Sequence, residues 1–229
     1  MRHPRKQFAL FALLAVVSGP AVFGLLRLRA EQDDAAIFAK RDAWQRPEEV
    51  MDELGVKSGS VVADVGCGSG YFVFHFASRV GPTGKVYAED VDSGVLRKLQ
   101  ARVHQDKLAQ VEVLEGTLDD PFLPAGTLDS ILVVNAYHEM KNYDAMLRGM
   151  YRALKPGGLL AIIDHEASPG QPRSEYLESH RIPEELVRED LARNGFQFLR
   201  SERGFESADS GKKYFFLIFG KPATFPEPH

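Results

Sequence analysis

The sequence has one cysteine, one tryptophan and no strong excess of either charge. A single cysteine excludes an internal disulfide and any metal centre built from several thiolates. The net charge of -4 at pH 7 provides no basic surface of the kind that binds nucleic acid, so we expect no nucleic-acid partner. With 229 residues, 44 % of them hydrophobic, the chain is long enough for one large domain with appendages.

Long uncharged stretches are also absent, except for one near the N-terminus at residues 8–26. Arginines and a lysine precede this run and two arginines follow it, so its orientation in a membrane stays open. The run is about long enough to span a bilayer, and its basic start is also typical of a secretory signal. We therefore expect residues 1–30 to be a membrane anchor or a cleaved signal peptide, with a core helix as a minor alternative. The protein would then be membrane-associated or exported.

The most informative stretch is residues 61–71, which read V-V-A-D-V-G-C-G-S-G-Y. Its β-branched first half predicts a buried strand over residues 61–65. Alternating glycines then predict a tight turn, and an apolar helical pattern follows over residues 71–80. A strand, a glycine turn and a helix together present backbone N–H groups to a ligand, so we expect a binding site at this turn.

The spacing of the glycines separates two classes of ligand. An aspartate precedes the first glycine, and the third glycine comes one residue earlier than in the dinucleotide fingerprint. The pattern D-x-G-x-G-x-G resembles motif I of the class I S-adenosylmethionine-dependent methyltransferases, with a type 11/25-like domain. The resemblance implies S-adenosyl-L-methionine as cofactor, whose cationic sulfonium suits an acidic strand end. The cofactor-binding residues that it implies here are Asp64, Gly66, Cys67, Gly68, Gly70 and Tyr71.

The next acidic cluster follows a second predicted strand that begins over residues 85–88 and ends E-D-V-D. The resemblance puts Asp90 in the role of binding the ribose hydroxyls, with Val91 beside it. By strand alternation, Glu89 would face the opposite side. In the loop after the third strand, the resemblance implies that Leu118 contacts the adenine and that Asp119 accepts a hydrogen bond from the adenine amine. The open alternative is that Asp119 is an exposed loop acid that binds no ligand.

The fourth predicted strand, residues 128–134, ends in N-A-Y-H-E. The resemblance places this segment beside the transferred methyl group, with Asn135 contacting the cofactor. Tyr137 and His138 would be the catalytic residues and would face the substrate. His138 is the candidate general base, because an imidazole titrates near neutral pH. A polar loop residue that merely orders the pocket is an equal alternative.

The motif L-K-P-G-G-x-L resembles the family's turn before the fifth strand, which we expect over residues 159–163 and which ends in D-H-E. After it, residues 167–181 are polar and irregular, in a position where the family carries substrate-specific insertions. We expect His165, His180 and Arg181 to line the substrate pocket. We expect no metal, because the histidines lack the close spacing of zinc ligands.

Seven predicted strands alternating with helices indicate an α/β, doubly wound, Rossmann-like sheet, mostly parallel, with an antiparallel C-terminal hairpin. The predicted organisation is a linker over residues 31–46, a methyltransferase domain over 47–220 and a disordered tail over 221–229. The resemblance implies direct in-line methyl transfer to a small molecule. The alternative is a catalytically silent, membrane-tethered binding module on the same fold. The sequence leaves the acceptor and the oligomeric state open.

Overall fold

The computed structural model of the protein describes residues 38–202 and 213–223. The predicted N-terminal segment 1–30, with its uncharged run 8–26, lies outside these residues, as do residues 224–229. Among the residues described, none of the helices combines the length and the apolar character needed to cross a bilayer. The compact unit described below begins at Arg41.

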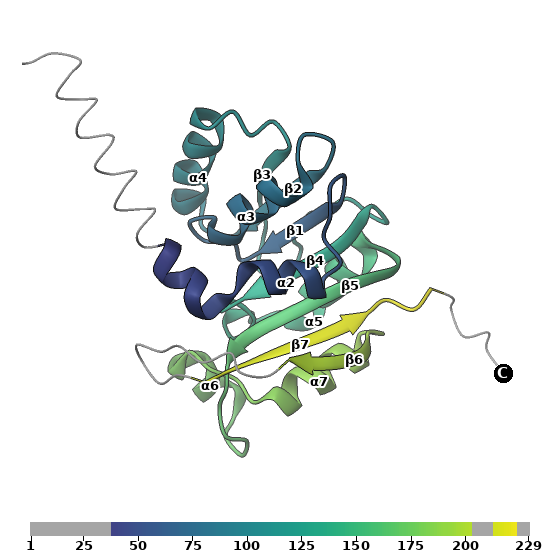
Figure 1. Ribbon diagram of the computed structural model, residues 1–229. Helices are drawn as coiled ribbons and strands as arrows, with labels where there is room; N and C mark the ends of the chain where they lie inside the picture. The colour runs from purple at the N-terminus through teal and green to yellow at the C-terminus, as the bar shows by residue number, and fades with distance from the viewer. Residues whose placement is uncertain (1–37, 203–212, 224–229) are drawn as a thin grey trace, which may run out of the picture. The chain divides into compact units, whose positions relative to one another are not determined.

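Seven strands form one sheet in this part of the chain, in the order β3-β2-β1-β4-β5-β7-β6 (Figure 1). Strands β3, β2, β1, β4 and β5 are parallel, and β7 is antiparallel to both β5 and β6. This order confirms the predicted doubly wound sheet with its C-terminal hairpin. The strands are β1 (Val61–Val65), β2 (Lys85–Asp90), β3 (Val111–Glu115), β4 (Leu128–Val134), β5 (Leu154–His165), β6 (Gln197–Glu202) and β7 (Tyr214–Gly220).

Helices lie on both faces of this sheet, as expected when right-handed crossovers run outward in both directions from β1 and β4. In Figure 1, α2 lies in front of the sheet and α5 behind it, where α5 and α7 share one apolar cluster with the strands. The connection from β3 to β4, residues 116–127, carries no helix. The helices are α2 (Pro47–Glu53), α3 (Tyr71–Val80), α4 (Ser93–Gln105), the 3-10 turn η1 (Tyr137–Glu139), α5 (Tyr143–Ala153), α6 (Arg173–Ser179) and α7 (Glu184–Arg193).

Two elements differ from the prediction. Strand β5 begins at Leu154, and not after the K-P-G-G turn, because Leu154 pairs with Leu128 and a register shift on β4 accommodates the glycines. The stretch 167–181, expected to be irregular, contains α6. The two ends of this stretch meet, because the Ile182 N–H donates to His165 O at 2.9 Å and the Ala167 N–H donates to Ile182 O at 3.1 Å.

The domain boundaries also differ from the prediction at both ends. Residues 38–45 are helical, Gln45 is buried, and the Trp44 ring lies 4.9 Å from the ring of Tyr214, so part of the expected linker belongs to the domain. At the other end, Lys221 Nζ donates to the carbonyls of Tyr151 at 2.8 Å and Leu154 at 2.7 Å. Lys221, the first residue of the expected disordered tail, is therefore held to the domain by two hydrogen bonds of its half-buried side chain.

Candidate functional site

The glycine turn is tied to the ends of three neighbouring strands. The N–H groups of Gly66 and Cys67 both donate to the carbonyl of Glu89 at 2.9 Å, and the Gly68 N–H donates to Asp90 Oδ2 at 2.9 Å. A Cβ built on Gly66 would lie 2.4 Å from the Cβ of Ala136, after β4, whereas one on Gly68 would meet nothing within 4 Å. The turn therefore packs against protein at its first glycine, Gly66, and leaves open space at its second, Gly68.

A cavity of about 410 Å³ lies at this open side, at the carboxyl ends of β1, β2 and β4. Ligands bind at this edge of open α/β sheets, where the strand order reverses. The structure brings six of the predicted cofactor-binding residues together around it. They are Gly66, Gly68, Asp90, Val91, Leu118 and Asn135.

The other predicted cofactor-binding residues do not line this cavity. Asp64 is buried in β1, and Gly70 packs against Leu99 where it begins α3. Asp119 accepts a hydrogen bond from the Thr117 hydroxyl at 2.7 Å instead of facing the cavity. Cys67 is also buried, and burial raises the pKa of its thiol, so it is no nucleophile at neutral pH.

Tyr71 does not line this cavity either, and its contact with the cofactor stays a prediction. Its side chain is buried, its hydroxyl hydrogen-bonds to Asp42, and the Arg41 guanidinium lies 3.9 Å from its ring centroid. Arg41 and Asp42, which the sequence pattern assigned to a linker, therefore contact the side chain that we expected to touch the cofactor.

Two buried acceptor atoms at the cavity lack a partner among the described residues. Glu89 Oε1 and Asn135 Oδ1 are both buried without a hydrogen bond. Glu89 was expected to face away, but its carboxylate occupies space left by Gly116, where a Cβ would lie 1.8 Å from Oε1. A ligand rich in hydrogen-bond donors would satisfy both atoms, because buried acceptors are costly when left unpaired.

Burial also shifts the protonation of the acidic groups under the turn. Burial raises the pKa of Asp64 to about 7, although the charge of nearby Arg41 opposes the shift. Burial likewise raises the pKa of Glu89 to about 8, against the stabilising effect of the Gly66 backbone N–H. Both carboxyls are therefore poised to ionise when a cation approaches, since an opposite charge favours the ionised form.

His138 lies next to this cavity in a carboxylate–imidazole pair. Its Nδ1 is 2.7 Å from Oδ1 of the fully buried Asp164, whose Oδ2 accepts the His138 backbone N–H at 3.0 Å. Burial alone would lower the pKa of His138, but the hydrogen bond and charge of Asp164, helped by Glu139, raise it above its ordinary value. The arrangement leaves Nε2 as the atom that exchanges a proton.

Tyr137 was predicted to be catalytic and to face the substrate, and the structure corrects this. Its side chain is fully buried, and its hydroxyl donates to Asp190 Oδ2 at 2.9 Å. Arg173 also donates to this carboxylate, at 2.5 Å. Burial and the charge of Asp190 raise the pKa of Tyr137, so the phenol stays protonated and has a structural role.

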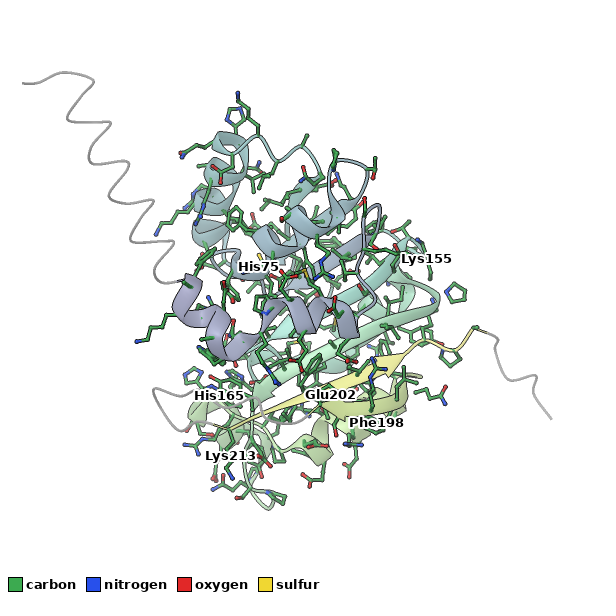
Figure 2. All side chains as sticks on the ribbon, in the orientation of Figure 1. His75, Lys155, His165, Phe198, Glu202 and Lys213 are labelled. Atoms are coloured by element: carbon green, nitrogen blue, oxygen red, sulfur yellow. The ribbon has the colours of Figure 1, made fainter. Side chains whose placement is uncertain are left out.

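The three remaining predicted substrate residues meet at a second cavity of about 720 Å³. His165, His180 and Arg181 all line it, together with Lys213. Figure 2 labels His165 and Lys213 at the end of the sheet where β5 finishes and β7 begins. His165 Nδ1 lies 3.2 Å from the carbonyl of His180, which links β5 to the end of α6.

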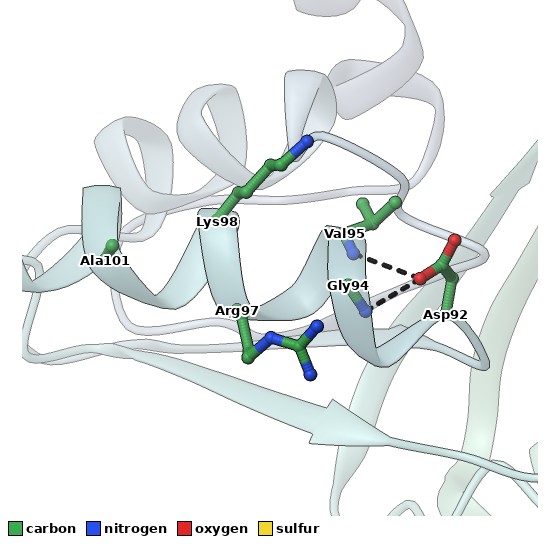
Figure 3. Close-up of a pocket in the computed structure, with 6 residues that line it drawn as sticks. All are labelled: Asp92, Gly94, Val95, Arg97, Lys98 and Ala101. Atoms are coloured by element: carbon green, nitrogen blue, oxygen red, sulfur yellow. Dashed lines mark hydrogen bonds between the residues drawn. The ribbon is translucent and has the colours of Figure 1, made fainter.

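A further hollow follows the first turns of α4 (Figure 3). There Asp92 accepts from the N–H groups of Gly94 at 2.7 Å and Val95 at 3.1 Å, and so caps the start of the helix. This hollow is a helix start and no part of the site. The site residues that the sequence argument missed are Glu89, Glu139 and Asp164, each of which stands at or just past the end of a strand.

Comparison with known proteins identifies the family of the chain. Residues 62–158 match the family model described as a methyltransferase domain. An S-adenosylmethionine-dependent methyltransferase from Aquifex aeolicus has a TM-score of 0.65 and 30 % identity, covering 76 % of this chain and 89 % of that one.

Two curated relatives are also similar. The demethylmenaquinone methyltransferase of Geobacillus sp. is 28 % identical over 127 residues, which is 56 % of this chain and 53 % of that protein. The ubiquinone/menaquinone biosynthesis C-methyltransferase of Escherichia coli is 25 % identical over 197 residues, covering 77 % of this chain and 78 % of that one. The chain thus spans about half the length of the demethylmenaquinone methyltransferases that it matches. By the Aquifex match and the shared sheet, the chain belongs to the family of S-adenosylmethionine-dependent methyltransferases.

Proposed function

We propose that the chain methylates a small molecule, with S-adenosylmethionine supplying an electrophilic methyl group on its sulfonium. The observation that carries the proposal is the cavity beside the glycine turn, which is lined by the acceptor-bearing residues Glu89, Asp90 and Asn135. S-adenosylmethionine has donors to match them: an ammonium group, two ribose hydroxyls and an adenine amine. Its positive charge suits a cavity lined by Glu89, Asp90 and Glu139.

The residues around the turn have separate roles in this proposal. Asp90 accepts from the ribose hydroxyls, and Leu118 packs against the adenine. Gly68 lets the ligand lie against bare backbone, and Asn135 accepts from the methionine end. The chain's contribution to rate is alignment and exclusion of water, because no enzyme nucleophile is needed.

The acceptor class that we propose is a hydroxylated aromatic ring of the quinol type. Two relatives are named for demethylmenaquinone and ubiquinone/menaquinone methylation, which supports this class. A ring hydroxyl must lose its proton to make the ring or its oxygen nucleophilic. His138, held by Asp164, is the group that would take this proton at Nε2. The cavity lined by His165, His180 and Arg181 would hold the rest of the acceptor.

Calorimetric titration of S-adenosylmethionine into the full chain tests the cofactor, with Asp90→Ala as the paired variant. We expect the full chain to bind and the variant to lose about tenfold or more in affinity, since it lacks a charged hydrogen-bond acceptor. Incubation with a reduced naphthoquinone, followed by mass spectrometry, then tests transfer. A full chain that does not bind the cofactor would refute the proposal.

The alternative, a silent membrane-tethered module, predicts either lost cofactor binding or cofactor binding without transfer to any acceptor. The named relatives are all methyltransferases and lend it no support. Membrane association or export through residues 8–26 stays a proposal, which fractionation of cells expressing the full chain would test.

A further inference from the structure

Two histidines and a glutamate converge beside the proposed acid–base group. His138 and Glu139 come from η1, and His180 directly follows α6 as its C-cap. His138 Nε2 lies 3.4 Å from His180 Nδ1 and 3.6 Å from Glu139 Oε1, and the last two atoms are 3.4 Å apart. The sequence argument expected no metal because these residues lack close spacing, but the fold supplies the proximity that the spacing does not.

The triangle has the dimensions of a metal site. A tetrahedral zinc ion with ligands at about 2.0–2.1 Å places neighbouring donor atoms about 3.3–3.4 Å apart. All three separations here are within a few tenths of an ångström of that value. For a plain hydrogen bond between two ring nitrogens, 3.4 Å is long, since N–H donors prefer distances of about 2.9–3.0 Å.

The surroundings of His138 match those of a metal ligand. Its Nδ1 is hydrogen-bonded to the buried Asp164, which fixes the tautomer and leaves the lone pair of Nε2 directed at His180 and Glu139. Ligating histidines almost always make such a bond through their other nitrogen. The His138 side chain is buried, while those of Glu139 and His180 are 57 % and 68 % exposed, so an ion can enter from solvent.

We propose that His138, Glu139 and His180 bind a divalent transition-metal ion, with Zn²⁺ as the best match. Two imidazoles and one carboxylate form the donor set of zinc sites that keep an open coordination position. Glu139 lines the cofactor cavity and His180 lines the second cavity, so the ion would sit where the two meet. With the ion bound, His138 Nε2 would be a ligand and would take no proton. If the proposed function holds, the open position would then bind the hydroxyl oxygen of the acceptor and lower its pKa, and the proton would leave to solvent. Metal binding itself does not depend on that function.

Zinc binding to the full, chelator-treated chain tests the inference, measured by competition with a chromophoric chelator and by the visible absorption of bound Co²⁺. We expect one tight site per chain. His180→Ala and Glu139→Gln should each weaken zinc binding by about 100-fold or more, and Asp164→Asn by about 10- to 100-fold. His104→Ala, which removes an exposed histidine on α4, is the matched control and should bind zinc as the full chain does.

Equal zinc binding by the full chain, His180→Ala and Glu139→Gln would overturn the inference, as would a full chain with no tight site. Circular dichroism checks that each variant folds. Because the side chains of Glu139 and His180 are exposed, we expect their substitution to leave the fold intact. S-adenosylmethionine titrations on the same samples separate the two proposals. Cofactor binding without zinc binding refutes the metal site and leaves the proposed function standing.

Discussion

At the scale of single residues, Gly68 carries the most information about ligand binding. It has a φ of +53°, donates its N–H to Asp90 and faces the open side of the turn. The ribose role proposed for Asp90 therefore places a ligand against this glycine. A side chain there would occupy ligand space without touching protein.

Gly68→Ala should cost the protein about 1 kcal/mol of stability, from the left-handed backbone, and most of its affinity for S-adenosylmethionine. Gly126→Ala is the matched control, because Gly126 has a φ of +65° and also meets nothing within 4 Å, but lies outside the cavity. Calorimetry and thermal unfolding on both variants make the comparison. Equal cofactor affinity in the two variants would contradict the assignment of the cavity.

The buried acids under the turn predict how stability depends on pH. Burial raises the pKa of Asp64 from an ordinary value of 3.8 to about 7, and the pKa of Glu89 from 4.5 to about 8. Both hold their protons more tightly in the folded than in the unfolded state, so the stability of the cofactor-free protein should fall as pH rises from about 4 to about 8.

Asp64→Asn and Glu89→Gln should each flatten this decline. We expect each variant to gain about 1 kcal/mol over the unsubstituted chain near pH 8, or a Tm increase of about 2–4 °C for a domain of this size. Glu115→Gln, at an exposed acid that ends β3, is the control and should leave the profile unchanged. Thermal unfolding between about pH 5 and 8 measures it. Parallel profiles for all four proteins would contradict the assignment of raised pKa values.

At the scale of elements, η1, α6 and α7 are held together by one carboxylate. Asp190 on α7 is buried and accepts from Tyr137 of η1 and Arg173 of α6, and also from Arg193 at 2.6 Å. Figure 1 shows α6 and α7 next to each other at the hairpin end of the sheet. The hydrogen bond to Asp190 explains why the segment N-A-Y-H-E turns its tyrosine inward.

Tyr137→Phe tests this structural role. We expect a loss of about 1 kcal/mol of stability, from one buried hydrogen bond, with unchanged affinity for S-adenosylmethionine. The readouts are the free energy of unfolding in urea and a cofactor titration. Loss of methyl transfer with unchanged stability would restore the catalytic role predicted from the sequence.

The elements could be predicted well where local pattern and burial agree. Strands β1 and β4 and helix α3 have the predicted bounds, because continuous β-branched or aromatic runs and glycine turns mark them. The orientation of single side chains could not be predicted. Glu89, Tyr71 and Tyr137 depend on contacts with Gly116, Asp42 and Asp190, which lie 27 to 53 residues away in the sequence. Helix α6 was missed because its seven residues follow a proline- and glycine-rich loop.

At the scale of the whole molecule, the globular domain begins earlier than the methyltransferase motifs. Arg41 and Asp42 contact Tyr71, and Trp44 stacks on Tyr214, so these residues support both the first helix after the glycine turn and the last strand. The segment called a linker in the sequence argument thus stabilises the cofactor side of the domain.

Two truncations test this boundary. A chain lacking residues 1–37 should keep the cofactor affinity and Tm of the full chain, whereas a chain lacking residues 1–46 should lose several degrees of Tm. The contact between the half-buried rings of Trp44 and Tyr214 alone is worth about 1 kcal/mol, or about 2–4 °C of Tm. Differential scanning fluorimetry and cofactor titration are the measurements. Equal Tm values for the two truncations would place the boundary back at Pro47.

The meeting of the two ends of residues 166–182 has a consequence for how such a protein can diversify. Because Ile182 returns to hydrogen-bond with His165, the pairing of the strands does not depend on how many residues lie between them. That stretch can be replaced as one unit while the edge of the sheet at the cofactor cavity, built from β1, β2 and β4, stays the same. His180 lies within this stretch and His138 lies outside it. A relative in which the stretch is replaced would therefore change its contacts with the acceptor and lose the His180 imidazole in the same step.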